Sequence, residues 1–246
     1  MDTSTAPSYR GYRFPAEIIS HCVWLYFRFC LSFRDVQEML LERGVVVSHE
    51  AIRLWCLKFG AAYARRLRHR RGRCGDTWHL DEVFCNINGQ LVYLWRAVDQ
   101  EGEVLDVLVQ SRRNARAAKR FLRKLLKGLR YSPRKIVTDK LPSYTSAHRE
   151  LIPEVDHQRG GRLNNRAENS HQPAREREPR MRRFKSMKQA QRFLSTHGQV
   201  SNHFRCGRHL MRACHYRNKM VKQFETWRVI CGVGQLADTV PQSSRG

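Results

Sequence analysis

Hydrophobic residues in the N-terminal part of the chain recur at intervals of three and four positions, which predicts helices. One helix is expected over Pro15–Leu31, a second that Ser32 opens and Gly44 closes, and a third with Ser48 as its N-cap. Two helices joined by a short glycine-containing turn are typical of a helix-turn-helix, whose second helix enters the major groove of DNA. An ordinary helical hairpin is the alternative interpretation of this pattern.

The pattern changes to that of strands at Thr77. Asn88-Gly89 and Glu101-Gly102 separate three runs rich in Val, Leu, Trp and Tyr, and such dipeptides are typical of hairpin turns. The expected elements are strands over Thr77–Asn86, Gln90–Asp99 and Glu103–Gln110, a helix over Asn114–Leu129, a strand over Lys135–Thr138, a short helix through Leu151, a strand over Val155–Gln158 and a basic helical region after Asn164.

The expected order β-β-β-α-β-α-β-α is that of a ribonuclease-H-like core, a mixed five-stranded sheet flanked by helices. The predicted fold class is therefore α/β (α+β), with the helix-turn-helix preceding the core. We predict a DNA-binding region with a basic linker over residues 1–72, the core over residues 73–205, and a basic C-terminal extension over residues 206–246 whose end is disordered.

Three acidic residues occupy positions that this fold is expected to bring together. Asp81 lies inside an apolar strand and Asp139 follows another, although Asp is a poor strand residue. The first and fourth strands are adjacent in the inferred order, and Glu168 begins the helix expected beside Asp81. Carboxylates so close repel each other without a cation, and hard oxygen ligands favour Mg²⁺ or Mn²⁺. Two such ions about 3.5–4 Å apart activate a water or 3′-hydroxyl for attack on a phosphodiester.

Each acid also has a structural alternative, since Asp81 suits a strand end, Asp139 a turn and Glu168 the start of a helix. Glu82 competes with Asp81 for the first position. Successive strand residues point to opposite faces, so only one of the two is expected in the site. His171 follows Glu168 by three residues, which places it on the same side of the predicted helix.

The net charge of the chain indicates the chemical class of its binding partner. The chain has 46 Lys and Arg against 22 Asp and Glu, a net charge of +24, while its 41% hydrophobic content excludes a disordered basic tail. Such a charge on a foldable chain implies a polyanion, and double-stranded DNA is the expected one. The candidate DNA contacts are His49, Arg53 and Lys58 on the outer face of the third helix, and Arg65, Arg66, Arg68, Arg70 and Arg71 in the basic linker.

The compartment is predicted from cysteines and apolar segments. Eight cysteines without a CxxC pair indicate reduced thiols in a cytoplasmic protein. The most apolar stretch, residues 18–33, contains His21 and Arg28 and is shorter than the roughly 20 residues of a membrane span, so no membrane partner is expected. A zinc site at Cys206, His209, Cys214 and His215 competes with the interpretation that these are helix residues on different faces.

Several motifs occur in an order that is specific for one family. They are Ser32-Phe33-Arg34-Asp35-Val36, Trp78-His79-Leu80-Asp81-Glu82, Tyr93-Leu94-Trp95-Arg96-Ala97-Val98-Asp99, Thr138-Asp139-Lys140, Asn164-Asn165-Arg166-Ala167-Glu168 and Arg183-Phe184-Lys185-Ser186. Across residues 14–204 the chain resembles bacterial DDE transposases of the insertion sequence 6 family.

The resemblance implies that Asp81, Asp139 and Glu168 are the catalytic and metal-binding residues. It also implies that Arg175 contacts a phosphate at the DNA end. The expected protein binds terminal inverted repeats, cleaves 3′ ends and joins them to target DNA in a replicative reaction that forms cointegrates. The protein is expected to act at the bacterial nucleoid, as a homodimer or higher oligomer that binds two synapsed ends.

Two features depart from the family pattern. Only 28 residues separate Asp139 from Glu168, which is a short spacer, and Pro173 is expected to kink or break the helix that begins at Glu168. The alternative functions are a helix-turn-helix DNA-binding regulator without catalysis, a related nuclease that acts on structured nucleic acid, and an inactive transposase copy.

Overall fold

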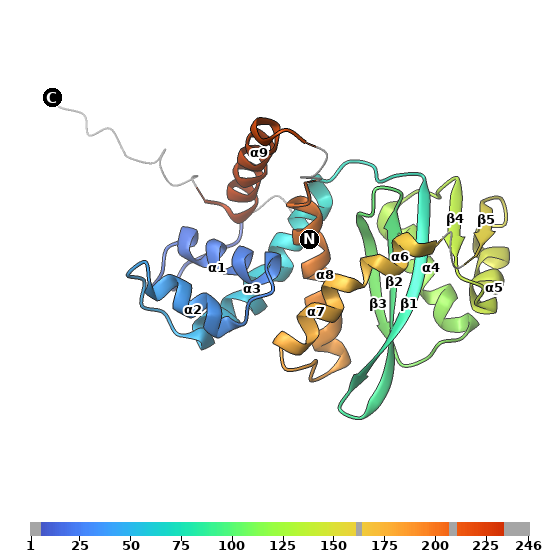
Figure 1. The fold of residues 1–246 in the computed structure, drawn as a ribbon, viewed down its shortest axis with the longest axis horizontal. Helices are drawn as coiled ribbons and strands as arrows, with labels where there is room; N and C mark the ends of the chain where they lie inside the picture. Colours follow the sequence, from blue (N-terminus) through green and yellow to red (C-terminus); the bar gives the residue numbers. More distant parts are fainter. Residues whose placement is uncertain (1–5, 161–163, 207–210, 234–246) are drawn as a thin grey trace. The chain divides into compact units, whose positions relative to one another are not determined.

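The structure is a computed structural model that describes residues 6–160, 164–206 and 211–233, arranged in two compact units. Unit 1 combines residues 1–70 with residues 203–246, and unit 2 comprises residues 71–202. The described elements, labelled in Figure 1, are α1 (Ala16–Arg28), α2 (Phe33–Leu41), α3 (His49–Arg70), β1 (Thr77–Ile87), β2 (Gln90–Asp99), β3 (Val104–Gln110), α4 (Ala115–Leu129), β4 (Lys135–Thr138), α5 (Pro142–Leu151), β5 (Asp156–Arg159), α6 (Asn165–Ser170), α7 (Gln172–Arg180), α8 (Met187–His203) and α9 (Ala213–Cys231).

The N-terminal helices of unit 1 begin where their capping residues predict. The Asp35 N–H donates to Ser32 Oγ at 3.1 Å and the Ser32 N–H donates to the Asp35 carboxylate at 2.8 Å, so a capping box opens α2. The Ala51 N–H donates to Ser48 Oγ at 3.2 Å at the start of α3. Gly44, after α2, has a φ of +74°, a conformation that glycine adopts without strain.

The arginine-rich segment predicted as a linker is mostly helical, which corrects that prediction. α3 continues through Arg70, because Tyr63, Ala64 and Leu67 maintain a buried stripe at helical spacing. Arginine is also a good helix former. Only residues 71–73 of the predicted linker follow the helix.

The C-terminal segment differs from the separate extension expected over residues 206–246, because α9 packs within unit 1. The Trp227 ring lies 5.2 Å from the ring of Tyr63 on α3 and 5.6 Å from that of Phe204. The Tyr9 hydroxyl donates to the carbonyl of Cys231 at 2.6 Å. The end that was expected to be disordered lies outside the described residues.

Unit 2 contains a five-stranded sheet in the order β3-β2-β1-β4-β5, which confirms the predicted ribonuclease-H-like core. β1, β2 and β3 form an antiparallel meander, whereas β4 pairs in parallel with both β1 and β5. The parallel ladder between β1 and β4 runs from Thr77–Lys135 to Leu80–Thr138. The first and fourth strands are therefore adjacent, as the element order predicts.

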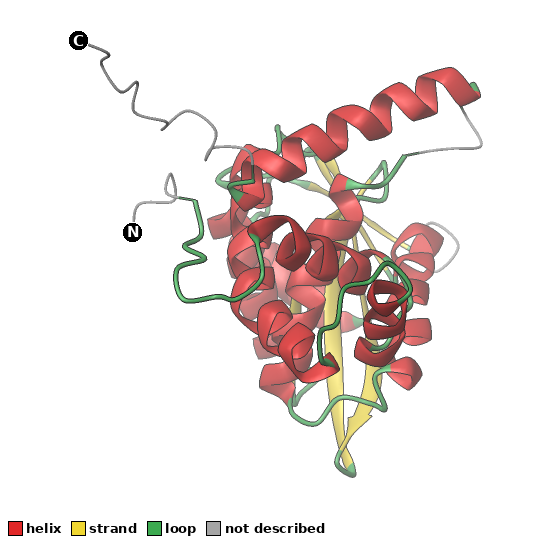
Figure 2. Cartoon of the chain, turned by 90° about the vertical axis from the view of Figure 1, so that its left-hand side faces the viewer, coloured by secondary structure: helices red, strands yellow, loops and turns green. Residues whose placement is uncertain are grey.

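The core of unit 2 lies between the sheet and the helices α4 and α5. Buried Leu80 and Trp95 from the strands pack with Phe121 of α4 and with Tyr144 and Ala147 of α5. The β1–β2 hairpin extends past this core (Figure 2), and Phe84, toward the turn of the hairpin, is 73% exposed.

Edge strand β3 obtains hydrogen bonds from two amide side chains of α8. Gln191 Oε1 accepts from the Val109 N–H at 2.8 Å, and its Nε2 donates to the Val107 carbonyl at 3.1 Å. Asn202 makes the same pair of contacts with Val104, both at 2.9 Å. An uncovered edge would expose unpaired backbone groups, so α8 closes this side of the sheet.

Two further features concern the described part of the chain. No described helix is long and apolar enough to cross a membrane. None of the eight cysteines, all of which lie in the described residues, forms a disulfide.

The stability of unit 2 is expected to fall with acidification because of His157. Its Nε2 lies 2.9 Å from the Thr138 hydroxyl, and burial, reinforced by the charges of His148 and Arg159, lowers its pKa from 6.5 to about 4. Between these values the unfolded chain binds a proton that the folded chain does not, so the free energy of unfolding decreases as the pH falls. Urea unfolding at pH 7 and pH 5 should show a smaller loss for His157→Gln than for the wild type.

His69→Gln, at an exposed position of α3, is the control for this measurement. An equal loss of stability in the wild type and in His157→Gln contradicts the prediction.

Candidate active site

The carboxylates of Asp81, Glu82 and Asp139 come together where the β1–β4 ladder ends. Leu80 and Thr138 are the last paired residues, so Asp81 and Asp139 directly follow the last pair. The ligand oxygens of the three side chains lie within 4.8 Å of one another. The Leu141 N–H donates to Asp139 Oδ1 at 2.9 Å, which orients that carboxylate at the start of α5.

Glu82 lies in this cluster together with Asp81, although strand alternation predicted that only one of the two would approach Asp139. Alternation along the strand sends the two side chains to opposite faces. β4 stops beside Leu80, however, and leaves the flank of β1 uncovered from Asp81 onward. With no strand paired to β1 on this side, both carboxylates come within 4.8 Å of the Asp139 carboxylate.

Arg113, between β3 and α4, neutralises part of this acidic cluster. Its Nε donates to Glu82 Oε1 at 2.6 Å, and its Nη2 lies 3.7 Å from Asp139 Oδ2. Burial raises the pKa of Glu82, whose side chain is only 1% exposed, and the charge of Asp139 adds to the rise while Tyr144 and Arg113 oppose it. Burial and the neighbouring carboxylates also raise the pKa of Tyr144. The sequence pattern assigned no role at the site to Arg113 or Tyr144, because both contacts depend on how α4 and α5 cover the sheet.

His171 contacts the opposite side of the cluster. Its Nε2 lies 3.3 Å from Asp81 Oδ2, and its side chain is completely buried. Burial lowers the pKa of His171 although Asp81 opposes that shift, so the imidazole is neutral at pH 7.

Glu168 lies on α6 and is exposed, and the structure does not include it in the cluster within 4.8 Å. The helix itself is anchored beside the site, as predicted. Buried Asn164 donates from Nδ2 to the Leu80 carbonyl at 2.7 Å, and Ala167 is buried on the same helix. Glu168 thus follows Asn164 by about one helical turn, and Asn164 contacts Leu80, the residue that precedes Asp81.

Pro173 breaks the helix, as the sequence predicts. α6 ends at Ser170, and α7 begins at Gln172 with Pro173 in its first turn, where the missing N–H costs no hydrogen bond. Arg175 is exposed on α7.

Most of the other candidate DNA contacts already have partners within the protein. His49 bonds to Gln37 Oε1 through its N–H at 2.8 Å, Arg53 forms an ion pair with Glu50, and the Lys58 ammonium lies 4.5 Å from the Tyr12 ring centroid. Arg66 donates to the Ile230 carbonyl, and Arg71 donates to the Val104 carbonyl at 3.1 Å. Arg68 is half-buried, while Arg65 and Arg70 are exposed at the end of α3.

The alternative zinc site falls partly outside the structure, because His209 lies outside the described residues. Cys214 and His215 are neighbours in the first turn of α9. Among the described residues, the cluster with metal-ligand spacing is Asp81, Glu82 and Asp139.

The donor set of this cluster suits a hard divalent cation. It consists only of carboxylate oxygens, which are the ligands of Mg²⁺ and Mn²⁺, whereas zinc prefers nitrogen and sulfur. Three carboxylates this close also repel one another unless a positive charge lies between them. Arg113 supplies one such charge on the side of Glu82 and Asp139.

A sheet of this order, with Asp81 and Asp139 directly after the last residue pair between its adjacent first and fourth strands, defines a ribonuclease-H-like domain. A family model described as a DDE domain matches residues 75–207. The chain belongs to the DDE transposases of the insertion sequence 6 family.

Curated relatives from Staphylococcus aureus agree with this assignment. The transposase for insertion sequence-like element IS431mec is 32% identical over 144 residues, which cover 58% of this chain and 64% of the relative. The transposase for insertion sequence element IS257 in transposon Tn4003 is 31% identical over the same shares. The chain thus spans less than two thirds of the length of these relatives. Among solved structures, the HTLV-2 integrase catalytic core domain in complex with magnesium has a TM-score of 0.38 and 14% identity, over 58% of this chain and 94% of that chain.

The Asn164 contact is expected to stabilise α6 against β1. Asn164→Ala removes a buried hydrogen bond, which typically lowers the free energy of unfolding by about 1–3 kcal/mol. Asn169→Ala, at an exposed position of the same helix, is the matched control and should change it by less than about 0.5 kcal/mol. Equal effects of the two substitutions in urea unfolding contradict this role of Asn164.

Proposed function

We propose that this protein is the DNA transposase of a bacterial insertion sequence, which cleaves 3′ ends of the element and joins them to target DNA in a metal-dependent, replicative reaction. The convergence of Asp81 and Asp139 at the end of the β1–β4 ladder carries this proposal. Terminal inverted repeats are the proposed specific substrate, and a homodimer or higher oligomer in the bacterial cytoplasm is the proposed working form.

Asp81 and Asp139 are the proposed principal metal ligands, and Glu168 is the proposed third catalytic carboxylate. A bound Mg²⁺ or Mn²⁺ pair supplies Lewis-acid stabilisation of the phosphodiester and lowers the pKa of an attacking water or 3′-hydroxyl. The protein's own contribution is to hold the carboxylates in place. The Leu141 N–H orients Asp139, and buried neutral His171 contacts Asp81.

Glu82 has a different role in this proposal. Its carboxylate is buried and bonded to Arg113, which in turn lies beside Asp139. Glu82 therefore positions Arg113, and the guanidinium limits the repulsion between the acids before a cation binds.

DNA binding follows from the charge of the chain. With a net charge of +24, the chain is expected to bind a polyanion in a salt-dependent manner. The exposed Arg65, Arg70 and Arg175 are the proposed phosphate contacts that the structure leaves accessible. His49, Arg53 and Lys58 remain proposed contacts on α3, although the side chain of each must exchange an internal partner for DNA, which for His49 is Gln37 Oε1 at 3.1 Å from Nδ1.

Asp139→Asn is expected to abolish strand transfer. The substitution removes a charged metal ligand, and the loss of several kcal/mol of transition-state stabilisation corresponds to a decrease on the order of 100-fold or more. The assay is the joining of a pre-cleaved terminal-repeat duplex to plasmid DNA in the presence of Mg²⁺. Asp156→Asn, at an exposed position of β5, is the charge-matched control, and full activity of Asp139→Asn refutes the mechanism.

The roles of the two glutamates are separable in the same assay. Glu168→Gln should lose strand transfer to the same extent as Asp139→Asn while its unfolding midpoint stays unchanged, because the side chain is exposed. Glu82→Gln should retain most of the strand transfer and change mainly the stability, because it weakens a buried ion pair. The reverse pattern would make Glu82, and not Glu168, the third catalytic carboxylate.

A further inference from the structure

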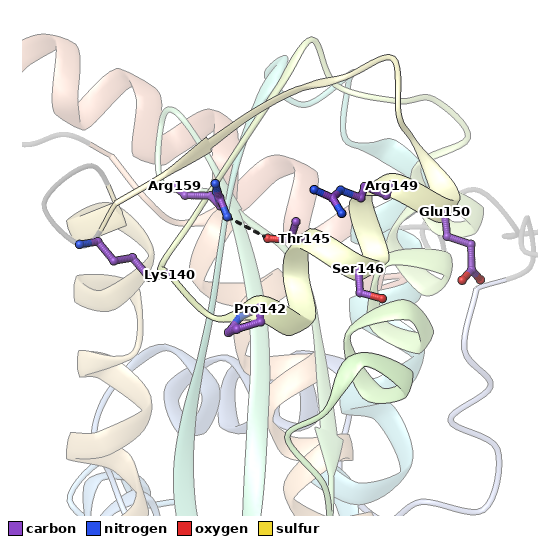
Figure 3. Close-up of a pocket in the computed structure, with 7 residues that line it drawn as sticks. All are labelled: Lys140, Pro142, Thr145, Ser146, Arg149, Glu150 and Arg159. Atoms are coloured by element: carbon purple, nitrogen blue, oxygen red, sulfur yellow. Dashed lines mark hydrogen bonds between the residues drawn. The ribbon is translucent and has the colours of Figure 1, made fainter.

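A cleft of about 580 Å³ runs along α5 next to the end of β5, and one of its lining residues, Lys140, directly follows Asp139 in the sequence. Its walls carry the cations Lys140, Arg149 and Arg159 and the hydroxyls of Thr145 and Ser146 (Figure 3). β4 and β5 are parallel, and Thr138 pairs with Arg159, so Lys140 and Arg159 leave the sheet at the same edge. Ligands of sheets that contain parallel strands bind at their carboxyl ends.

The cleft carries a positive charge that the protein itself does not neutralise. All three cations are exposed, and among the described residues no acidic side chain lies within ion-pair distance of them. Arg159 Nη1 donates to Thr145 Oγ1 at 3.4 Å, which holds the guanidinium over the cleft. The one acidic wall residue, Glu150, pairs with Lys119 and Arg123 of α4.

The chemistry of the walls favours a phosphate over a base or an apolar group. The lining has donors from two guanidinium groups, one ammonium and two hydroxyls, and it includes no aromatic ring. Proteins that bind unpaired bases stack them on aromatic side chains, whereas backbone phosphates are bound by Arg, Lys, Ser and Thr. At one end of the cleft, Lys140 is adjacent in sequence to Asp139 of the carboxylate cluster.

We infer that this cleft binds one backbone phosphate of DNA next to the reacting phosphodiester, and so positions the strand over the carboxylates. The inference rests on the proposed function, because it assigns the ligand as a part of the same DNA substrate. The phosphate belongs either to the element's end or to target DNA, and the two sources share the chemistry that the cleft recognises.

Salt-dependent DNA binding tests the assignment without requiring catalysis. The full chain is titrated in EDTA between 50 and 200 mM salt against two fluorescent duplexes, one of random sequence and one with the terminal repeat read from the DNA that flanks the gene. Arg149→Gln/Arg159→Gln should lower the slope of log K against log salt by about 1, the value expected for one lost phosphate contact. Arg149→Lys/Arg159→Lys keeps the charge and should retain the slope.

A matched control removes two charges elsewhere in unit 2. Arg120→Gln/Lys127→Gln changes two exposed cations on α4 that do not line the cleft, and its slope should stay close to that of the wild type. If the slope of the cleft variant decreases only with the repeat duplex, the phosphate belongs to the element's end. If it decreases only with the random duplex, the phosphate belongs to target DNA. A decrease with both duplexes assigns a contact that is common to the two. Equal slopes for the cleft and control variants on both duplexes overturn the inference.

The two proposals fail in different ways. If the wild type lacks metal-dependent strand transfer and the cleft variant still loses salt dependence, the proposed catalysis fails and the phosphate site stands. If strand transfer depends on Asp139 and the cleft variant binds both duplexes as the control does, the site fails and the catalysis stands.

Discussion

The parallel hydrogen bonding of β1 to β4 stops at the pair Leu80–Thr138, and the chemistry of unit 2 depends on where this ladder ends. One residue further on each strand is an aspartate, and the end of β4 leaves room for Glu82 to join them. The same strand end delivers Lys140 to the neighbouring cleft. Acidic Asp139 and basic Lys140 are thus adjacent in sequence, and α5 begins at Pro142, shortly after them.

Holding three carboxylates together costs free energy, and the surroundings offset this cost from several sides. Arg113 pairs with Glu82 and approaches Asp139, while a neutral His171 contacts Asp81. Burial makes the charged form of Glu82 unfavourable, which raises its pKa. A divalent cation would relieve the same repulsion, so the geometry that is costly for the free protein favours metal binding.

The basic side chains do not form a uniform DNA-binding surface, because several of them bind other groups of the protein. Arg66 and Arg71 bind backbone carbonyls, and Arg53 pairs with Glu50. These side chains serve the fold, in agreement with the continuation of α3 through the predicted linker. The cations without acidic partners around the cleft at α5 are a better guide to DNA contacts than the length of an arginine run, because a phosphate must find donors that the protein has not already used.

Local pattern determined most of the element order by itself, because strand and helix periods, turn dipeptides and capping residues act over a few positions. It also identified Asp81 and Asp139, since an acid inside an apolar strand or directly after one is conspicuous. Only the tertiary structure decided that Glu82 joins them, that Arg113 and His171 flank them, that Glu168 stands apart on α6, and that α9 packs with the N-terminal helices. These contacts join residues distant in sequence, so they depend on where strands end and on how helices cover the sheet, which no local pattern records.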